Sequence, residues 1–316
     1  MGLFSSKCTA STRLDGKTVV ITGANTGIGK STAQDFYTRG ARVVMACRNL
    51  GKAKRAVEEL QKACKSKPNL GTLLITKLDL SSLKSVKECA AHILETEKSI
   101  HLLINNAGVT MWALARTEDG FEMQMGVNHL GHFLFTMLLL PRIYSSAPAR
   151  IVNVSSDVYM FGGRIDLEDL NWHKRRYCFL LAYQQSKLAN ILFTKELSTK
   201  LKEHDIKDVT VYSLHPGIVN TNLADHVLGE YRISNWLHHR LSKWLMKTAD
   251  QGAQTTIYCA VDEKCATENG LYYYECAPRT LLWNARNMED ARALWQASLK
   301  LVQLPQDYDP FTKEYV

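Results

Sequence analysis

The stretch that decides the fold is Thr18-Val-Val-Ile-Thr-Gly-Ala-Asn-Thr-Gly-Ile-Gly-Lys30. Residues 18–22 are mostly β-branched and end at a glycine cluster, which predicts a buried strand. Glycines at 23, 27 and 29 let the chain turn tightly and approach a ligand without a clash from Cβ. A helix is predicted to follow, and its N-terminal N–H groups favour phosphate. The spacing is G-x-x-x-G-x-G, and its strand–turn–helix context favours a phosphate loop over a tight turn without a ligand.

Outward from this unit, short apolar runs alternate with helical stretches along nearly the whole chain. Strands are predicted at 18–22, 42–46, 72–78, 101–105, 150–155, 208–214 and 270–274. Helices are predicted at 30–39, 53–64, from a cap at Ser81 or Ser82 to about 97, 121–144, 183–202, and 288–302 after a cap at Asn287. Strands separated by helices of roughly 10 to 20 residues indicate βαβ units. We therefore expect an α/β fold with a Rossmann-type, doubly wound parallel sheet.

The alternation is expected to form a single domain over 15–304, between an N-terminal tail at 1–14 and a C-terminal tail at 305–316. The segment 223–250 interrupts the alternation and is interpreted as an excursion over the substrate site. The chain has 316 residues, of which 46% are hydrophobic and 22% charged, so collagen-like and wholly disordered chains are excluded. Its net charge of +8 suits an anionic ligand or a negatively charged membrane surface. We expect no nucleic-acid partner and no membrane-spanning helix, since the longest uncharged apolar run is 133–140.

The eight cysteines form no CxxC pair and no cluster with histidine, and the N-terminus has no secretory signal. We therefore expect reduced thiols, no disulfide and no metal. The first residues, Met1-Gly-Leu-Phe-Ser-Ser6, fit the M-G-x-x-x-[ST] pattern of N-myristoylation, although a chance match is the alternative. Because one myristoyl chain binds a membrane only marginally, Cys8 is the candidate for a second acyl chain.

The second predicted strand ends in Ala46-Cys47-Arg48, about twenty residues beyond the glycine turn. An acidic residue here would bind the ribose 2′-hydroxyl of NAD, whereas a cation accommodates the 2′-phosphate of NADP. Arg48 therefore predicts NADP(H) as cofactor, the alternative being a surface arginine.

Three motifs together resemble the short-chain dehydrogenase/reductase superfamily over about 14–304. They are the glycine turn, Asn105-Asn-Ala-Gly108 and Tyr183-Gln-Gln-Ser-Lys187. Within it, three further stretches are most similar to the retinol dehydrogenases that reduce retinaldehyde with NADPH. These stretches are 117–124, 127–132 and 169–172. Members of that group usually begin with a hydrophobic membrane anchor, which we do not find here.

The catalytic chemistry rests on Tyr183 and Lys187, which lie four residues apart and hence on one face of a helix. The pKa of a free phenol is near 10, and a neighbouring cation is expected to lower it. The resemblance implies that Tyr183 is the acid that protonates a substrate carbonyl and that Lys187 also holds the nicotinamide ribose. It further implies that Ser156 bonds the same oxygen, with Ser155 the alternative, and that Asn128 holds a water in a relay to Lys187.

The resemblance also assigns the cofactor contacts. These are Gly23, Asn25, Thr26, Gly27, Ile28 and Gly29 in the turn, Arg48, Asp79, Leu80, Asn106, Ala107, Tyr183, Lys187, Val219 and Thr221. Three histidines, His129, His132 and His215, invite a metal-site interpretation, but we expect structural roles because the family needs no metal.

A set of large side chains is consistent with an apolar pocket for a long aldehyde: Met111, Trp112, Phe161, Trp172 and Phe179. The stretch 232–247 alternates basic residues with Trp and Leu at helical spacing, which fits either a membrane-surface helix or an amphipathic lid. The leading hypothesis is NADPH-dependent, reversible reduction of retinaldehyde or a similar lipophilic carbonyl. The expected location is the cytoplasmic side of a membrane, either the endoplasmic reticulum or a lipid droplet, with a cytosolic location as the alternative. A homodimer is also considered. The alternatives are a reductase of steroids, quinones or other lipid carbonyls, and a non-catalytic dinucleotide-sensing scaffold.

Overall fold

The computed structural model describes residues 6–219, 246–305 and 308–311. They form an eight-stranded sheet in the order β3-β2-β1-β4-β5-β6-β7-β8, in which only β8 is antiparallel to its neighbour. The strands are β1 (Thr18–Thr22), β2 (Arg42–Cys47), β3 (Thr72–Lys77), β4 (Leu102–Asn105), β5 (Ala149–Val154), β6 (Val209–His215), β7 (Tyr272–Tyr274) and β8 (Ala277–Pro278). The strand order turns back between β1 and β4, which confirms the predicted doubly wound Rossmann-type sheet.

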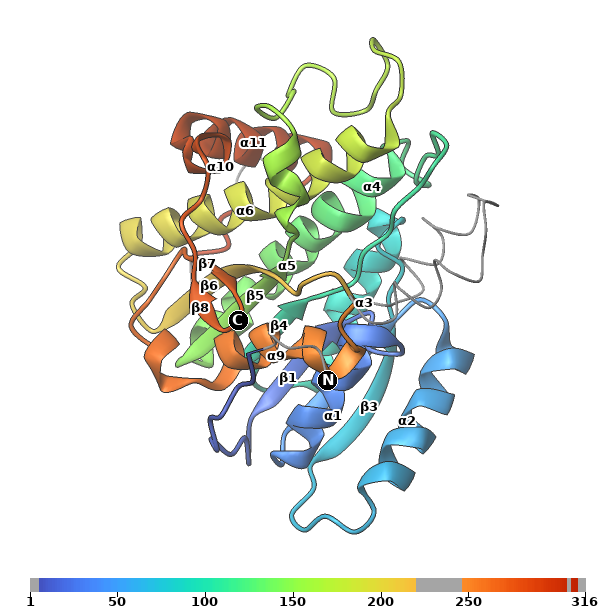
Figure 1. Cartoon of the computed structure of the whole chain (residues 1–316), viewed down its shortest axis with the longest axis vertical. Helices are drawn as coiled ribbons and strands as arrows, with labels where there is room; N and C mark the ends of the chain where they lie inside the picture. Colours follow the sequence, from blue (N-terminus) through green and yellow to red (C-terminus); the bar gives the residue numbers. More distant parts are fainter. Residues whose placement is uncertain (1–5, 220–245, 306–307, 312–316) are drawn as a thin grey trace.

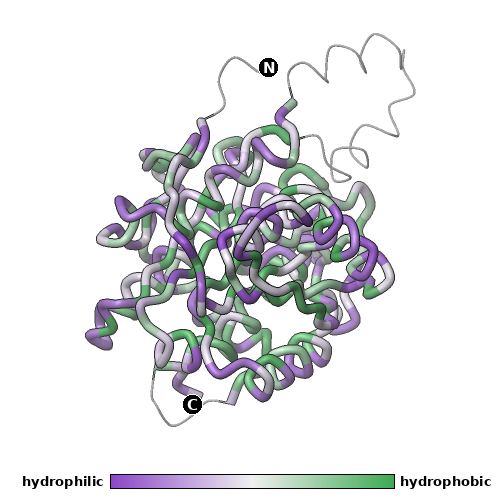
Figure 2. The backbone as a smooth tube through the Cα atoms, turned by 90° about the horizontal axis from the view of Figure 1, so that it is seen from below, coloured by the Kyte–Doolittle hydropathy of each residue, from purple (hydrophilic) through white to green (hydrophobic). Residues whose placement is uncertain are grey.

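Helices cover both faces of the sheet (Figure 1). One apolar core lies under α3 (Leu83–Thr96), α5 (Gly131–Ser145), α6 (Phe179–Glu203) and α11 (Met288–Leu301). The other lies under α1 (Gly27–Thr38), α2 (Leu50–Cys64) and α9 (Ala249–Val261). Hydrophobic segments gather inside the molecule, while the peripheral helices alternate hydrophobic with hydrophilic residues (Figure 2). Short helical pieces complete the described chain: α4 (Met123–Met125), η1 (Gly126–Leu130), η2 (Asp157–Phe161), η3 (Glu263–Cys265) and α10 (Trp283–Arg286).

Most predicted elements are confirmed, with shifts at their starts. Helix α1 begins at Gly27, three residues before the prediction, because the glycine turn itself forms its first turn. The predicted helix 121–144 is not uniform: a π-helical turn, η1, separates α4 from α5. Helix α9 was not predicted; its capping box of Thr248 and Gln251 starts it inside the predicted excursion 223–250. Most of that excursion, and most of 232–247, lies outside the described residues.

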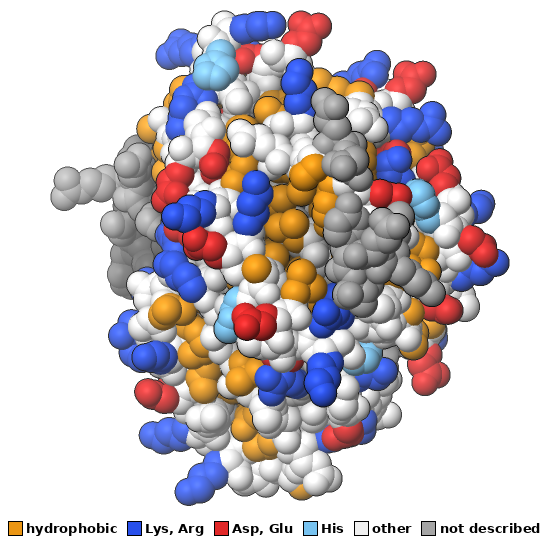
Figure 3. Space-filling model, turned by 180° about the vertical axis from the view of Figure 1, so that it is seen from behind, with side chains coloured by type: hydrophobic (Ala, Val, Ile, Leu, Met, Phe, Trp, Pro, Cys, Tyr) orange, Lys and Arg blue, Asp and Glu red, His pale blue; other side chains and the backbone are white. Residues whose placement is uncertain are grey.

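Charged side chains of both signs are spread over the face of the molecule in Figure 3. Lys and Arg side chains are distributed among Asp and Glu on the face in Figure 3, with an apolar strip in the middle of that face. The positive net charge therefore does not gather into one dominant patch on this face. Within the described residues, no helix is both long enough and apolar enough to span a bilayer.

Candidate active site

The glycine turn brings the end of β1 against the segment after β4. Gly23 has φ +67°, and a Cβ there would lie 3.0 Å from the Cα of Ala107. A Cβ on Gly29 would lie 2.5 Å from Asn106 Nδ2, so a side chain at either position would force the two segments apart. Helix α1 then begins at Gly27, and its N-cap Thr26 makes no side-chain cap bond. The first N–H groups of α1 thus remain open to an anion.

Thr22 joins these segments, and sequence reasoning missed it. Its hydroxyl oxygen accepts hydrogen bonds from the N–H groups of Asn106 and Ala107, both at 2.9 Å. Asn106 Nδ2 donates in return to the Thr22 carbonyl at 2.9 Å. The last residue of β1 therefore fixes the backbone of the predicted ribose-binding segment.

Two cations mark the adjacent sheet edge. Arg48 follows β2 and is exposed. Lys77, at the end of β3, donates from its Nζ to the backbone carbonyl of Arg48 at 2.6 Å. The next predicted contacts also lie here. The Asp79 carboxylate accepts from the N–H of Ser81 at 3.0 Å and from its hydroxyl at 2.7 Å, and Leu80 is buried. Lys77 is a second candidate for a phosphate, found only through the pairing of β2 with β3.

The predicted catalytic pair lies on α6. Lys187 Nζ is 5.6 Å from the centre of the Tyr183 ring and donates to the carbonyl of Val154 at 3.1 Å. Burial raises the pKa of Tyr183 to about 12 and lowers the pKa of Lys187 to about 8. The expected lowering of the tyrosine pKa by lysine is therefore wrong for this structure, because burial decides the direction. At neutral pH Tyr183 keeps its proton.

The two adjacent serines after β5 have different surroundings. Ser155 is buried, and its hydroxyl donates to the carbonyl of Lys187 at 2.6 Å. Ser156 is half-buried and accepts from the N–H of Val158 at 3.3 Å, which leaves its hydroxyl proton free of any described partner. Only Ser156 therefore retains a donor for a bound ligand.

Asn128 lies in the π-helical turn. Its Oδ1 accepts from the N–H of Val109 at 2.7 Å, and its Nδ2 donates to the Val109 carbonyl and to Ser186 Oγ, each at 2.9 Å. A Cβ on Gly108 would lie 3.4 Å from Asn128 Oδ1 and 3.5 Å from Lys187 Nζ. Gly108 therefore lies directly beside both Asn128 and Lys187, at ordinary van der Waals distances.

The three histidines have different partners and do not form one cluster. His129 Nε2 is 2.9 Å from Ser298 Oγ, and His132 lies between Thr22 and Asn128. His215 stacks on Tyr274, with ring centres 5.3 Å apart. Burial lowers the pKa of all three. Within the described residues, no group of three or more His, Cys, Asp or Glu side chains is arranged to hold a metal ion.

The remaining predicted cofactor loop follows β6. Val219 is 8% exposed and pairs with Lys247 in an isolated β-bridge. A Cβ on Gly252 would lie 2.6 Å from Val219, so the start of α9 closes over this loop. Thr221 lies outside the described residues.

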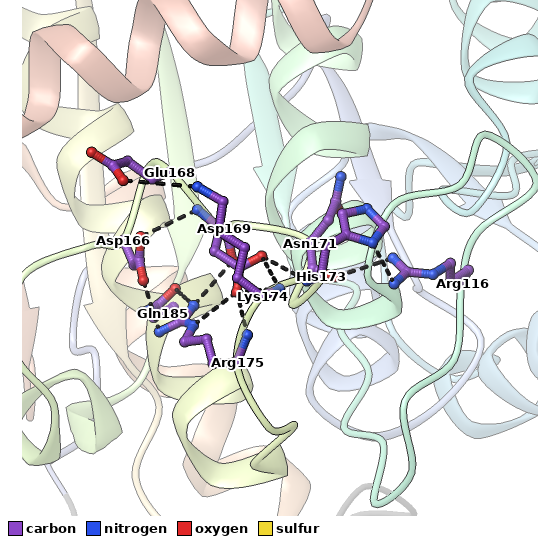
Figure 4. Close-up of polar contacts among 9 residues, drawn as sticks. All are labelled: Arg116, Asp166, Glu168, Asp169, Asn171, His173, Lys174, Arg175 and Gln185. Atoms are coloured by element: carbon purple, nitrogen blue, oxygen red, sulfur yellow. Dashed lines mark hydrogen bonds and ion pairs between the residues drawn. The ribbon is translucent and has the colours of Figure 1, made fainter.

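The segment before α6 is held by a buried carboxylate (Figure 4). Asp169 accepts hydrogen bonds from the N–H groups of His173, Lys174 and Arg175 at 2.6, 3.2 and 3.1 Å. Burial opposes its charge, yet these N–H bonds and the Arg175 guanidinium hold the pKa of Asp169 below its usual value. Arg175 also reaches Gln185 Oε1 on α6 at 3.5 Å. The segment is thus tied to the helix that carries Tyr183.

The five predicted pocket residues do not all converge. Trp112 and Phe179 pack closely, with ring centres 3.9 Å apart, and Phe179 lies one turn before Tyr183 on α6. Trp172 is buried under Arg175, whose guanidinium carbon is 4.0 Å from the centre of its ring. Phe161 is 82% exposed. Of this set, Phe179 is therefore the aromatic side chain closest in sequence to Tyr183, and Trp112 packs against it.

The N-terminal cysteine is inside the molecule. Cys8 is 8% exposed, packs in the core beneath α1 and α9, and its N–H donates to Gln254 Oε1 at 3.1 Å. Burial raises the pKa of its thiol. All eight cysteines are free thiols. Acylation of Cys8 would require the tail to leave this site.

Comparisons with known proteins find one matching family and several similar chains. The family described as short chain dehydrogenase matches residues 17–165. The chain is 46% identical over 305 residues to human retinol dehydrogenase 11, covering 96% of this chain and 92% of that protein. It is 45% identical over 295 residues to mouse retinol dehydrogenase 12, covering 93% and 89%. A crystal structure of an uncharacterised Mycobacterium paratuberculosis protein is similar with a TM-score of 0.73 at 35% identity, covering 95% and 98%.

Proposed function

Because this chain belongs to the short-chain dehydrogenase/reductase family, and is therefore an NAD(P)-dependent oxidoreductase of CH–OH or carbonyl groups, we propose that it reduces retinaldehyde or a similar lipophilic aldehyde with NADPH. The observation that carries this proposal is a protonated Tyr183 placed on the same face of α6 as Lys187. The similarity to retinol dehydrogenases supports the substrate class.

In the proposed mechanism, bound NADPH supplies the hydride. The hydroxyl of Tyr183 protonates the carbonyl oxygen of the substrate as negative charge develops on it. The free hydroxyl of Ser156 donates a second hydrogen bond to that oxygen. Lys187 keeps a positive charge beside the phenol, while Asn128 fixes the segment after Val109 and the turn of α6 at Ser186.

The preference for NADPH is proposed to rest on Arg48. The open N-terminus of α1 suits the pyrophosphate, and Arg48 with Lys77 offers two cations at the predicted 2′-phosphate position. Arg48→Glu is expected to raise the KM for NADPH by about 10- to 100-fold and to favour NADH, because a charge-assisted bond is replaced by repulsion. Steady-state kinetics with both cofactors measures this. Lys62→Glu, an exposed charge reversal at the other end of α2, is the control, and an equal loss there would contradict the assignment.

A pH dependence follows from the buried pair. Lys187 is a cation below about pH 8 and neutral above it, while Tyr183 stays protonated to about pH 12. The reduction rate at saturating substrate is therefore expected to be flat from pH 6 to 8. It should then fall by about tenfold per pH unit, as the cation that stabilises the phenolate product is lost. Initial rates from pH 6 to 10, with unfolding checked at each pH, test this; a reduction rate that rises through pH 8 would contradict it.

Trp112 and Phe179 favour an apolar, conjugated substrate, since their paired rings lie one turn from Tyr183. Turnover of all-trans-retinal with NADPH and with NADH, beside a panel of steroids, quinones and aliphatic aldehydes, tests the proposal. Retinal turnover with NADPH supports it. Faster turnover of a steroid or quinone would favour a different lipid-carbonyl reductase, and cofactor binding without any turnover would favour a sensing scaffold.

We also propose peripheral contact with the cytoplasmic side of a membrane through N-myristoylation, the alternative being a cytosolic protein. The pattern Gly2–Ser6 supports it, whereas the buried Cys8 is not available as a second acyl site in this structure. Gly2→Ala is expected to move the chain from membrane to soluble fractions, and an unchanged distribution would contradict lipidation. We further propose that the chain forms a homodimer. Its interface would lie away from the face of α6 that α11 covers within the chain, where the ring centres of Trp295 and Phe193 are 5.9 Å apart.

A further inference from the structure

One buried side chain, that of His132, links the glycine turn at the end of β1 to the π-helical turn that carries Asn128. It is the second residue of α5, directly after the π-helical turn, and is 1% exposed. Its Nε2 lies 2.8 Å from Thr22 Oγ1 and its Nδ1 lies 3.1 Å from the backbone carbonyl of Asn128. The imidazole therefore spans from the end of β1 to the turn that holds Asn128.

The neighbours decide which ring nitrogen carries the proton. Thr22 Oγ1 already accepts from the N–H groups of Asn106 and Ala107, so its own proton must be donated onward. The nearer acceptor is His132 Nε2 at 2.8 Å, since the carbonyl of Ile104 is 3.5 Å away. Burial lowers the pKa of His132 to about 4, so at neutral pH the ring has a single proton. That proton lies on Nδ1, where it donates to the Asn128 carbonyl, which can only accept.

We propose that His132 is a positioning residue for catalysis: its Nδ1–H holds the backbone carbonyl of Asn128, and its Nε2 accepts from Thr22 at the start of the glycine turn. This inference rests on the proposed function. Asn128 commits its side chain to Val109 and Ser186, so its carbonyl is the group left for His132 to fix. Through Ser186, whose hydroxyl donates to the Tyr183 carbonyl at 2.8 Å, the same turn supports the catalytic face of α6.

The two ends of this link differ in how they tolerate its loss. Thr22 can turn its proton to the Ile104 carbonyl and keep its two contacts on the cofactor side. Asn128 has no other side-chain donor to its carbonyl within the described part of the chain. Loss of the imidazole should therefore slow the chemical step while NADPH binding is retained.

The test compares His132→Leu, His132→Asn and a matched control, His129→Leu. The amide nitrogen of asparagine can replace Nδ1–H but cannot reach Thr22. His129 is equally buried and lies three residues earlier, in the π-helical turn, but its Nε2 contacts Ser298 Oγ and not Thr22 or the Asn128 carbonyl. We expect His132→Leu to lower kcat by about 10- to 100-fold. NADPH affinity, measured by fluorescence, should stay within about threefold. His132→Asn should restore most of kcat, and His129→Leu should keep kcat near that of the unsubstituted chain.

Equal losses in the His132→Leu and His129→Leu variants, no rescue by asparagine, or a loss confined to NADPH affinity would each overturn the proposal. A second measurement does not depend on turnover: ¹⁵N NMR of the histidine side chains in the full chain, with and without NADPH. A proton on Nδ1 of His132 from pH 6 to 8 supports the link, and a proton on Nε2 overturns it. Failure of the unsubstituted chain to reduce any carbonyl would count against the proposed function alone, because the NMR result would still decide whether His132 links Thr22 to the Asn128 carbonyl.

Discussion

Tyr183→Phe is expected to lower the turnover of every carbonyl substrate by about 10³-fold or more, since it removes the proposed proton donor and nothing else of the ring. The phenol is half-buried beside Lys187, and burial keeps it protonated at neutral pH, so its loss leaves no equivalent acid at this position. NADPH affinity should change by less than about threefold, since a methyl-sized cavity is not created and the helix face is preserved. Rapid-mixing measurement of NADPH oxidation, beside equilibrium binding of NADPH, separates the two effects.

Tyr212→Phe is the matched control. Tyr212 is fully buried on β6; its hydroxyl donates to the carbonyl of Cys265 and accepts from Thr210 Oγ1 at 2.8 Å, away from Tyr183. Its loss should lower the melting temperature but leave turnover nearly unchanged. Turnover retained by the Tyr183→Phe variant would show that another group protonates the carbonyl.

The parts of the fold that were predictable are those encoded by local patterns. The strand 18–22 was placed with its observed bounds because β-branched residues and the following glycine are adjacent in the chain. The starts of α1 and α6 were placed three and four residues late, since glycine at 27 and the apolar run from Phe179 to Ala182 form helix only in their tertiary setting. The π-helical turn around Asn128 has no periodic signature in the sequence.

The sequence predicted which residues form the site better than it predicted their protonation states and partners. Motif spacing identified Tyr183 and Lys187, but the direction of their pKa shifts depends on burial by segments far along the chain. Thr22 and Lys77 were missed because each acts through a neighbouring strand, Thr22 on the segment after β4 and Lys77 on Arg48. Cys8 was predicted as the candidate for a second acyl chain, which needs an accessible thiol, whereas the structure buries Cys8 and Gln254 on α9 accepts a hydrogen bond from its N–H.

The two adjacent serines offer the sharpest remaining distinction, because motif alignment alone chose between them. Ser156→Ala is expected to lower kcat by about 10²- to 10³-fold, the usual effect of removing one donor to a developing oxyanion. Ser155→Ala should instead destabilise the fold by about 1 kcal/mol, because it breaks the bond to the Lys187 carbonyl. Its kcat should fall by less than about tenfold.

Measuring kcat and thermal unfolding for both variants distinguishes the two serines. We expect the larger loss of kcat in Ser156→Ala and the larger loss of stability in Ser155→Ala. Ser156 is the N-cap of the short helix η2 and accepts one long N–H bond there, from Val158 at 3.3 Å, so alanine is expected to cost about 0.5 kcal/mol, the low end of N-cap losses. Ser155 has no free proton for a ligand while its hydroxyl is bonded to α6. If the Ser155→Ala variant lost turnover and the Ser156→Ala variant kept it, the hydroxyl proposed to polarise the carbonyl would have to be that of Ser155. The helix carrying Tyr183 and Lys187 would then have to shift in the ternary complex to release it.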